Sequence, residues 1–232
     1  MKKRYRETFE NGPGGWWGWI SNSGGPKALE YKKGSVTTRS PWWIDYNHAP
    51  PGAGYLHMLF CMYTKGSGVG EVYKETAGYH RFMKEKYPTD FTNARITVRL
   101  RGELERRGAN LVFLMQATVG GITSAWVLTG QPLKVTPKWT VQTLKLTPNP
   151  RQWTCLGSRH DRRDMYGYVD LPTVLRDVNC DLMFIMFPLN VVPMGPIQGN
   201  PHRLRPVKDY PVWPSRLPEG YVTMDTVQFD FA

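Results

Sequence analysis

Cysteine is scarce in this 232-residue chain, and its placement excludes two common uses of the residue. Cys61, Cys155 and Cys180 are an odd number, no C-x-x-C pair occurs, and no histidine lies near them at metal-ligand spacing. These features predict neither a disulfide framework nor a zinc site. A reducing compartment, the cytoplasm, is the simpler expectation.

Long apolar runs are also missing. A membrane-spanning helix needs about 18 or more consecutive apolar residues, and the nearest stretch, 180–192, is interrupted by Asp181, Pro188 and Asn190. The start, Met1-Lys2-Lys3-Arg4, is similar to that of a signal peptide, but no apolar segment follows it. The chain as given therefore predicts neither a membrane span nor a secretory leader.

Motifs of familiar catalytic and nucleotide sites are absent as well. The sequence contains neither the Gly-x-Ser-x-Gly elbow nor the Glu-x-Asp-x-x-Glu motif of family 16 glycoside hydrolases. The glycine-containing stretch 65–70 lacks a Walker lysine and a strand-loop-helix context, so we expect a flexible hairpin or insertion loop. Cys61 lies in an apolar context, where a thiol behaves as a small hydrophobe of the core.

Positive charge is abundant, with 30 Lys and Arg against 19 Asp and Glu, a net charge of +11. Such an excess favours polyanions or acidic ligands through long-range attraction. The basic residues cluster at positions 2–6 and 159–163 and are otherwise scattered. Because no helix-turn-helix, zinc-finger or RNP pattern accompanies them, the sequence weighs against nucleic-acid binding.

Turn residues are frequent, 23 Gly and 19 Pro, and the apolar runs between them are short, which predicts strands. Alternation over 96–101 predicts a strand with one wet face. The next run, 111–117, is apolar except for Gln116, as in a strand covered on both sides or lining a concave surface; we expect it to pair with 96–101. Further strands are expected at 28–31, 35–39, 55–63, 124–128, 140–146, 181–187 and 222–231.

Helical patterns are limited to 71–86 and a short turn at 172–178. The segment 188–218 holds eight prolines together with apolar residues, so we expect a long ordered loop. We predict one β-sandwich domain over 1–232, with insertions at about 65–90, 147–170 and 188–220.

The two ends of the chain resemble jelly-roll carbohydrate-binding modules of the family 4, 9 and 22 type. Residues 9–12, Phe-Glu-Asn-Gly, followed by Gly15-Trp16, are similar to the opening of these modules, and residues 222–229 resemble their closing strand. Lys138-Trp139 leading into 143–146 is similar to another of their strands. The resemblance implies an all-β jelly-roll β-sandwich that binds carbohydrate, with a structural calcium held by Glu10 and Asp225.

Aromatic and polar residues crowd the segment 40–57, which Pro and Gly keep from becoming a helix. A pyranose packs its CH-rich face on an aromatic ring while its hydroxyls require donors and acceptors. We predict a ligand-binding set for a carbohydrate or glycoside; the alternative is that the tryptophans pack the core and the histidines are satisfied structural residues. The set is Trp42, Trp43, Tyr46, Asn47, His57, Gln116 and Arg159.

A second polar cluster, 159–168, contains the side-chain types that a lyase or hydrolase uses. The candidate catalytic residues are Asp45, His48, His160 and Tyr166, and Arg159 is suited to an acidic group. The alternative is a solvated loop with local ion pairs. The sequence thus favours a carbohydrate-binding protein, with a glycan-active enzyme and an assembly protein with aromatic patches as alternatives, and it leaves room for a homo-oligomer.

Overall fold

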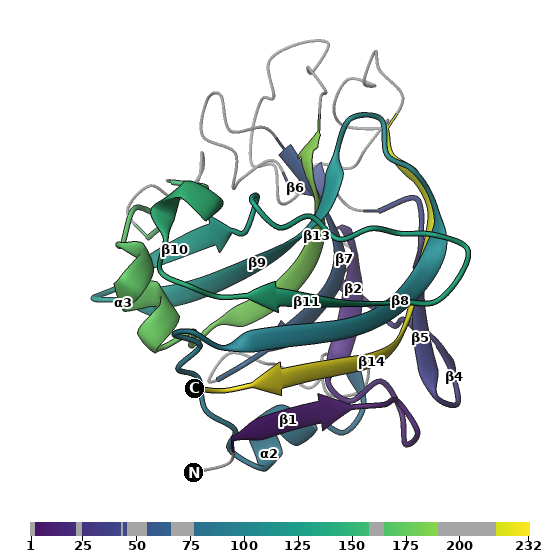
Figure 1. Ribbon diagram of the computed structural model, residues 1–232, viewed down its shortest axis with the longest axis horizontal. Helices are drawn as coiled ribbons and strands as arrows, with labels where there is room; N and C mark the ends of the chain where they lie inside the picture. The colour runs from purple at the N-terminus through teal and green to yellow at the C-terminus, as the bar shows by residue number, and fades with distance from the viewer. Residues whose placement is uncertain are drawn as a thin grey trace.

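The protein is an all-β, two-sheet antiparallel sandwich, seen in a computed structural model that describes residues 3–21, 25–42, 44–45, 55–65, 77–157, 165–189 and 217–232. Figure 1 shows the two layers, a front sheet and a back sheet, with the β1 and β14 ends side by side at the lower left. No helix among these residues is long and apolar enough to cross a membrane. The predicted fold class is confirmed.

The front sheet contains six strands in the order β11-β8-β14-β5-β4, with β1 pairing the second half of β14. Alternation shapes each strand: in β8 the residues Ile96, Val98 and Leu100 are buried and their neighbours face outward. The strand bounds are β1 (Arg4–Glu7), β4 (Glu30–Lys32), β5 (Ser35–Arg39), β8 (Arg95–Glu105), β11 (Thr140–Lys145) and β14 (Glu219–Asp230).

The back sheet contains eight strands in the order β12-β10-β9-β13-β7-β2-β3, with β6 also pairing β7. Its central strands are buried along nearly their whole length, not at alternate positions. The bounds are β2 (Trp16–Ser21), β3 (Gly25–Lys27), β6 (Ile44–Asp45), β7 (Tyr55–Tyr63), β9 (Asn110–Val119), β10 (Ile122–Val127), β12 (Thr154–Cys155) and β13 (Asp181–Leu189).

The main core fills the space between the sheets. Phe113 and Phe184 of the back sheet face Val98 and Phe229 of the front sheet, all within one cluster. Near the β1 edge, Tyr5 packs on Phe82, with 5.2 Å between ring centroids. Because β1 contributes this fully buried tyrosine, the basic start of the chain is an edge strand of the sandwich.

Two short helices, α2 (Arg81–Lys84) and α3 (Leu171–Arg176), and one 3-10 turn, η1 (Pro150–Gln152), complete the described elements. Asp170 caps α3 by accepting from the Thr173 N–H at 3.0 Å, and His80 caps α2. The helix expected over 71–86 is wrong for residues 78–80, because Gly78 has a φ of +65° and His80 has the non-helical backbone of an N-cap. Residues 71–76 lie outside the described part.

The expected pairing of 96–101 with 111–117 is also wrong. The first run is β8 of the front sheet, between β11 and β14, whereas the second is β9 of the back sheet, between β10 and β13. The turn at 106–109 therefore crosses from one sheet to the other. The physical reason is burial: β9 is apolar on both faces, and only a central position in a sheet covered on both sides buries it.

The front sheet bends sharply where β8 and β14 turn upward at the right of Figure 1. Here the two backbones approach so closely that a Cβ on Gly102 would lie 2.1 Å from the Tyr221 carbonyl oxygen, and one on Gly220 would lie 1.9 Å from that of Glu103. Glycine is therefore required at both positions of the bend.

Candidate functional site

The outer face of the back sheet, which looks away from the main core, is apolar and buried. We call it the covered face. The outer face of a sheet in a two-layer sandwich is ordinarily polar and wet. Ala77 and Leu156 join this cluster from outside the strands. The strand residues that form the apolar part of the covered face are Trp17, Leu56, Met58, Cys61, Val112, Leu114, Ala125, Val127, Met183, Ile185 and Phe187.

At one end of the covered face, polar side chains replace the apolar ones. Asp181 of β13 is the register partner of Tyr63 in β7 on one side and of Gln116 in β9 on the other. We call these three residues the polar row. Asp181 is 9% exposed and Gln116 is 5% exposed. A carboxylate, an amide and a phenol thus lie side by side on three adjacent strands, at the start of an apolar surface.

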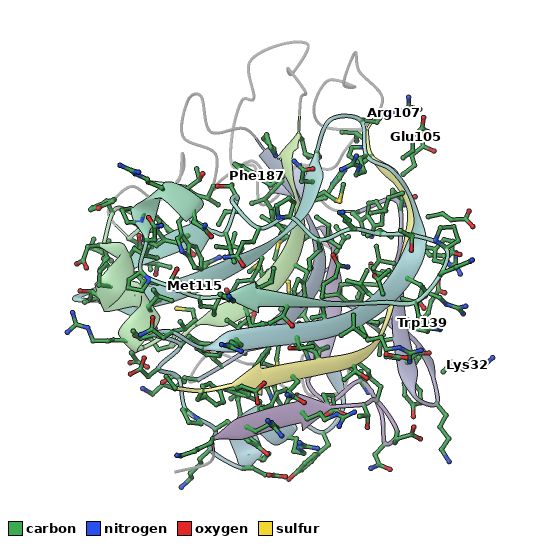
Figure 2. The ribbon with its side chains drawn as sticks, viewed as in Figure 1. Lys32, Glu105, Arg107, Met115, Trp139 and Phe187 are labelled. Atoms are coloured by element: carbon green, nitrogen blue, oxygen red, sulfur yellow. The ribbon has the colours of Figure 1, made fainter. Side chains whose placement is uncertain are left out.

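The face on which Gln116 lies follows from its neighbours. Met115 and Ala117 belong to the main core, so Gln116 points to the opposite side, as Leu114 does. We expected Gln116 to be a polar group on an otherwise apolar surface, and in β9 it lies among buried apolar residues. Figure 2 labels Met115 on β9 and Phe187 at the far end of β13, away from the polar row.

Aromatic and hydroxyl groups extend the polar row. The Trp17 ring stacks on Tyr63 with 5.4 Å between centroids and 27° between planes. On the other side, the hydroxyls of Thr118 and Thr123 are 2.7 Å apart. The end of the covered face therefore combines a buried indole with groups that donate and accept hydrogen bonds.

The chain before β13 is fixed by a network around Asn179. Its side-chain oxygen accepts from the Thr118 N–H at 2.8 Å, and its amide donates to the Thr118 carbonyl at 3.0 Å. Burial and then the charge of Asp181 raise the pKa of the neighbouring Cys180 thiol to about 11, so this thiol stays protonated and is no nucleophile at neutral pH. The network orients Asp181 at the end of the row.

Asp177 anchors the same segment on its other side. Burial alone would raise the pKa of this carboxyl, but hydrogen bonds from Thr89, Lys65 and Asn179 outweigh it and lower the pKa. Asp177 is thus an ionised structural group at neutral pH. Among the described side chains of the covered face, Asp181 is the single carboxylate.

Trp42 and His57, two predicted ligand residues, lie on the inner side of the back sheet. Trp42 is 6% exposed, and its indole N–H donates to the Thr38 hydroxyl at 2.9 Å. His57 is 1% exposed, with 5.9 Å between its ring and that of Trp42. Both side chains pack as the structural alternative describes. They lie on the opposite face of the sheet from Gln116, and the structure does not bring them together with it.

Tyr166 comes to the polar end of the covered face. It forms a parallel bridge with Thr123 at the β10 edge, where the Thr123 N–H donates to the Met165 carbonyl at 2.7 Å. Gln116 lies on β9, the strand next to β10. The structure therefore places these two predicted site residues at the same corner of the back sheet.

Asp45 lies at the opposite edge. Its backbone pairs with Leu56 of β7, and β10, β9, β13 and β7 separate β6 from Tyr166, a width of about 24 Å at the usual strand spacing. Asp45 and Tyr166 are thus not brought together. The other predicted site residues lie outside the described part of the chain and stay predictions: Trp43, Tyr46, Asn47, His48, Arg159 and His160.

Of the pair expected to hold calcium, Asp225 lies in β14 of the front sheet and Glu10 lies in the turn that follows β1. The Glu10 carboxylate lies beside Gly34, two residues before Val36, the register partner of Met224. Asp225 forms an ion pair with Arg99, and no group of three or more metal-ligating side chains occurs among the described residues. Because a guanidinium at the carboxylate competes with a cation, this donor set does not fit a calcium ion.

Sequence reasoning missed Tyr63, Asp181 and Trp17 as members of the site. Asp181 is a single acid at the head of an otherwise apolar strand, which is a recognisable signal. Its partners depend on which strands become neighbours and in which register, and that information comes only from the fold.

Comparisons with known proteins leave the chain without a family. No protein-family model matches it, and no curated protein matches it. A solved structure described as "Prominent members of the human gut microbiota express endo-acting O-glycanases to initiate mucin breakdown" is similar over 98% of this chain and 98% of its own, with 10% identity and a TM-score of 0.40. A likeness this distant carries no argument for function, so the resemblance to carbohydrate-binding modules rests on short motifs.

Proposed function

We propose that the protein binds a carbohydrate or glycoside at the polar end of the covered face. The observation that carries this proposal is the polar row of Tyr63, Asp181 and Gln116, buried at the start of an apolar sheet face. Burying a carboxylate and an amide costs free energy that a purely structural apolar layer avoids. Groups of this kind suit a ligand with many hydroxyls.

The chemistry of the row matches a sugar. Asp181 accepts hydrogen bonds, Gln116 both accepts and donates, and the Tyr63 phenol does either. The Trp17 ring, which is 1% exposed, stacks on Tyr63 and fixes the position of its phenol. A few placed polar groups on a mostly apolar floor is the general pattern of a small-molecule site.

The predicted residues Arg159 and His160 lie outside the described residues, but the chain on either side of them is bound to β10. Gly157 and Met165 flank the stretch that contains them; the Leu156 N–H donates to the Ala125 carbonyl and the Thr123 N–H to the Met165 carbonyl, both on β10. In the proposal, Arg159 serves an acidic or polar substituent of the ligand. This part of the proposal is tested separately below.

The test is a thermal-shift screen of the purified protein against neutral and acidic oligosaccharides. A ligand at 100 times its Kd stabilises the folded state by about 2.7 kcal/mol, which raises the Tm by roughly 5–10 °C for a chain of this size. We expect the shift to disappear in Asp181→Asn and Gln116→Met and to persist in Glu219→Gln, a matched carboxylate-to-amide change at an exposed position of the front sheet. Arg159→Ala and His48→Ala then show whether either predicted residue joins the site.

Two results contradict the proposal. One is a ligand shift that both covered-face variants retain; the other is no shift with any oligosaccharide, which favours the assembly alternative. If Asp181→Asn unfolds, Tyr63→Phe removes one hydroxyl from the row with little change in packing, and isothermal titration of this variant gives the same decision.

A further inference from the structure

The outward side chains of β8 change sign along the strand. Arg95, Arg99 and Arg101 project from its first half, and Glu103 and Glu105 follow beyond Gly102. The inward residues between them are buried, so these groups all lie on the outer face of the front sheet. Along β8, the first half of this face is therefore positive and the second half is negative.

Neighbouring strands extend the positive half. In one cross-strand row, Arg95 has Lys145 of β11 on one side and Asp230 of β14 on the other, and Asp230 in turn pairs with Arg4 of β1. We call this surface the basic face. Its carboxylates among the described residues are Asp225 and Asp230; its cations are Lys3, Arg4, Arg6, Arg95, Arg99, Arg101 and Lys145.

Trp139 orders two of these cations. The Arg99 and Arg101 guanidinium groups pack on its ring at 4.7 and 4.8 Å from the centroid. Arg99 also pairs with Asp225. Figure 2 shows Trp139 at the right of the front sheet, before the bend. Guanidinium groups held in this way lose less rotamer freedom when they bind an anion.

Neutral hydrogen-bonding groups lie between the cations. The hydroxyls of Thr97 and Thr143 are 3.0 Å apart on adjacent strands, and Gln228 is the register partner of Thr97 on the other side. At the corner of the face, a shallow hollow of about 620 Å³ is lined in part by Lys3 and Arg95. The basic face thus alternates charge with neutral polar groups over a flat, wet surface.

We propose that the basic face is a second binding surface, for a linear anionic glycan that carries sulfate or carboxylate groups. Arginine recognises both groups with paired N–H donors. The distance from Arg95 to Arg101 along β8 is about 20 Å at the usual rise per residue, so several charged groups of one chain contact the face together. The threonine and glutamine side chains bind the sugar hydroxyls between those charges.

The same observations favour a glycan over a nucleic acid. A single strand binds by stacking its bases on open aromatic faces, whereas the Trp139 ring carries two guanidinium groups. A duplex is read by an element that enters a groove, whereas the basic face is the broad outer surface of a sheet. Attraction between the arginines and phosphate groups would still produce weak binding to nucleic acid. The experiment therefore also measures binding of a nucleic acid.

The test compares two triple variants that remove the same charge. Arg95→Gln/Arg101→Gln/Lys145→Gln removes three cations of the basic face, and Lys84→Gln/Arg151→Gln/Arg176→Gln removes three exposed cations elsewhere. Binding of heparin, of polygalacturonate, of neutral dextran and of poly(dT) is measured by fluorescence anisotropy at 50 and 300 mM NaCl. We expect the basic-face variant to lose at least tenfold in affinity for heparin or polygalacturonate, and the matched variant to stay within threefold of the unmodified protein.

Three outcomes overturn the proposal: equal losses in both triple variants, tighter binding of poly(dT) than of either anionic glycan, or no binding of either glycan at 50 mM NaCl. The second outcome replaces the glycan with a nucleic acid. Because the basic face and the covered face belong to different sheets, Asp181→Asn leaves heparin binding unchanged, and failure here is distinguishable from failure of the proposed function.

Discussion

The two outer faces of this sandwich are built in opposite ways. The outer face of the front sheet is exposed to solvent and carries many charged side chains. Arg101 is exposed on it, and Val141 is 65% exposed. The back sheet also buries the apolar part of its outer face, down to 0% exposure at Ile185. A sandwich needs only one buried face per sheet. The second buried face is therefore an additional feature of this protein, and it is where the polar row lies.

The difference also separates two kinds of recognition. On the covered face a few polar groups sit in a region of low exposure, where each hydrogen bond made or lost has a large effect. On the basic face many charges act together through water, and salt weakens them. The first arrangement suits selection of one ligand, and the second suits attraction of an extended polyanion.

The largest expected difference between the two faces is in stability, when one apolar side chain is shortened on each of them. Ile185→Ala removes buried methyl groups and leaves a cavity, so we expect the free energy of unfolding to fall by about 3–4 kcal/mol. Val141→Ala on the front sheet should change it by less than about 0.5 kcal/mol. Urea unfolding measures both. Similar losses at the two positions would remove the distinction between the faces.

Acid should weaken the N-terminal cap of α2, where His80 is buried, before it weakens the basic face. Burial lowers the pKa of His80 to about 4, and its ring accepts from the Met83 N–H. Because the pKa of His80 is lowered in the folded protein, the stabilisation that depends on its neutral ring is complete above about pH 6.5. It is lost as the pH falls through 4, and we expect the free energy of unfolding to fall by about 2–3 kcal/mol. Urea unfolding at pH 7.5, 5.5 and 4.0 follows it.

His80→Asn provides the control, because asparagine keeps a capping oxygen without titrating in this range. This variant should show a flatter dependence between pH 6.5 and 4. On the basic face, burial raises the pKa of Asp230, but hydrogen bonds from Arg4 and Gln228 outweigh it and lower the pKa. The stabilisation that depends on the ionised Asp230 is lost only below the ordinary pKa of an aspartate, at more acidic pH than that which depends on His80. Identical pH profiles for the variant and the unmodified protein would contradict the assignment to His80.

The smallest expected effect concerns Trp139. A double-mutant cycle of Trp139→Leu and Arg101→Gln should give a coupling energy of about 0.5–1 kcal/mol, the usual size of an exposed cation–π contact. The same cycle with Arg95→Gln should give a coupling near zero. Equal coupling in both cycles would show that Trp139 responds to charge in general and does not order Arg101 specifically.

Local patterns predicted the strands well where alternation or burial is strong. The strands expected at 35–39 and 55–63 have those bounds, and Val227 and Phe229 of the closing strand are fully buried, as their alternation indicates. The edge strand Arg4–Glu7 was not predicted, because three of its four residues are charged and Tyr5 is its one apolar residue. In so short a strand, one apolar residue is too few to reveal the alternation of buried and exposed positions.

The site was less predictable than the strands. Gln116 stands out as one polar residue in an apolar run, and this signal survives in the structure. Trp42, chosen for its aromatic ring and polar neighbours, is instead buried with its N–H bonded to Thr38, because large aromatic rings pack cores more often than they meet ligands. The polar row needs the pairing of β7, β13 and β9, which joins residues more than 50 positions apart.

The close approach at Gly102 and Gly220 has an electrical consequence. The bend lies between the arginines of β8 and the carboxylates of Glu103 and Glu105, and Figure 2 shows Glu105 beyond it, at the upper right with its ion-pair partner Arg107. Opposite charges held apart on the two arms of a bent sheet form a dipole. In the field of a polyanion this dipole experiences a torque that turns the positive arm forward, so the protein is oriented before any contact forms.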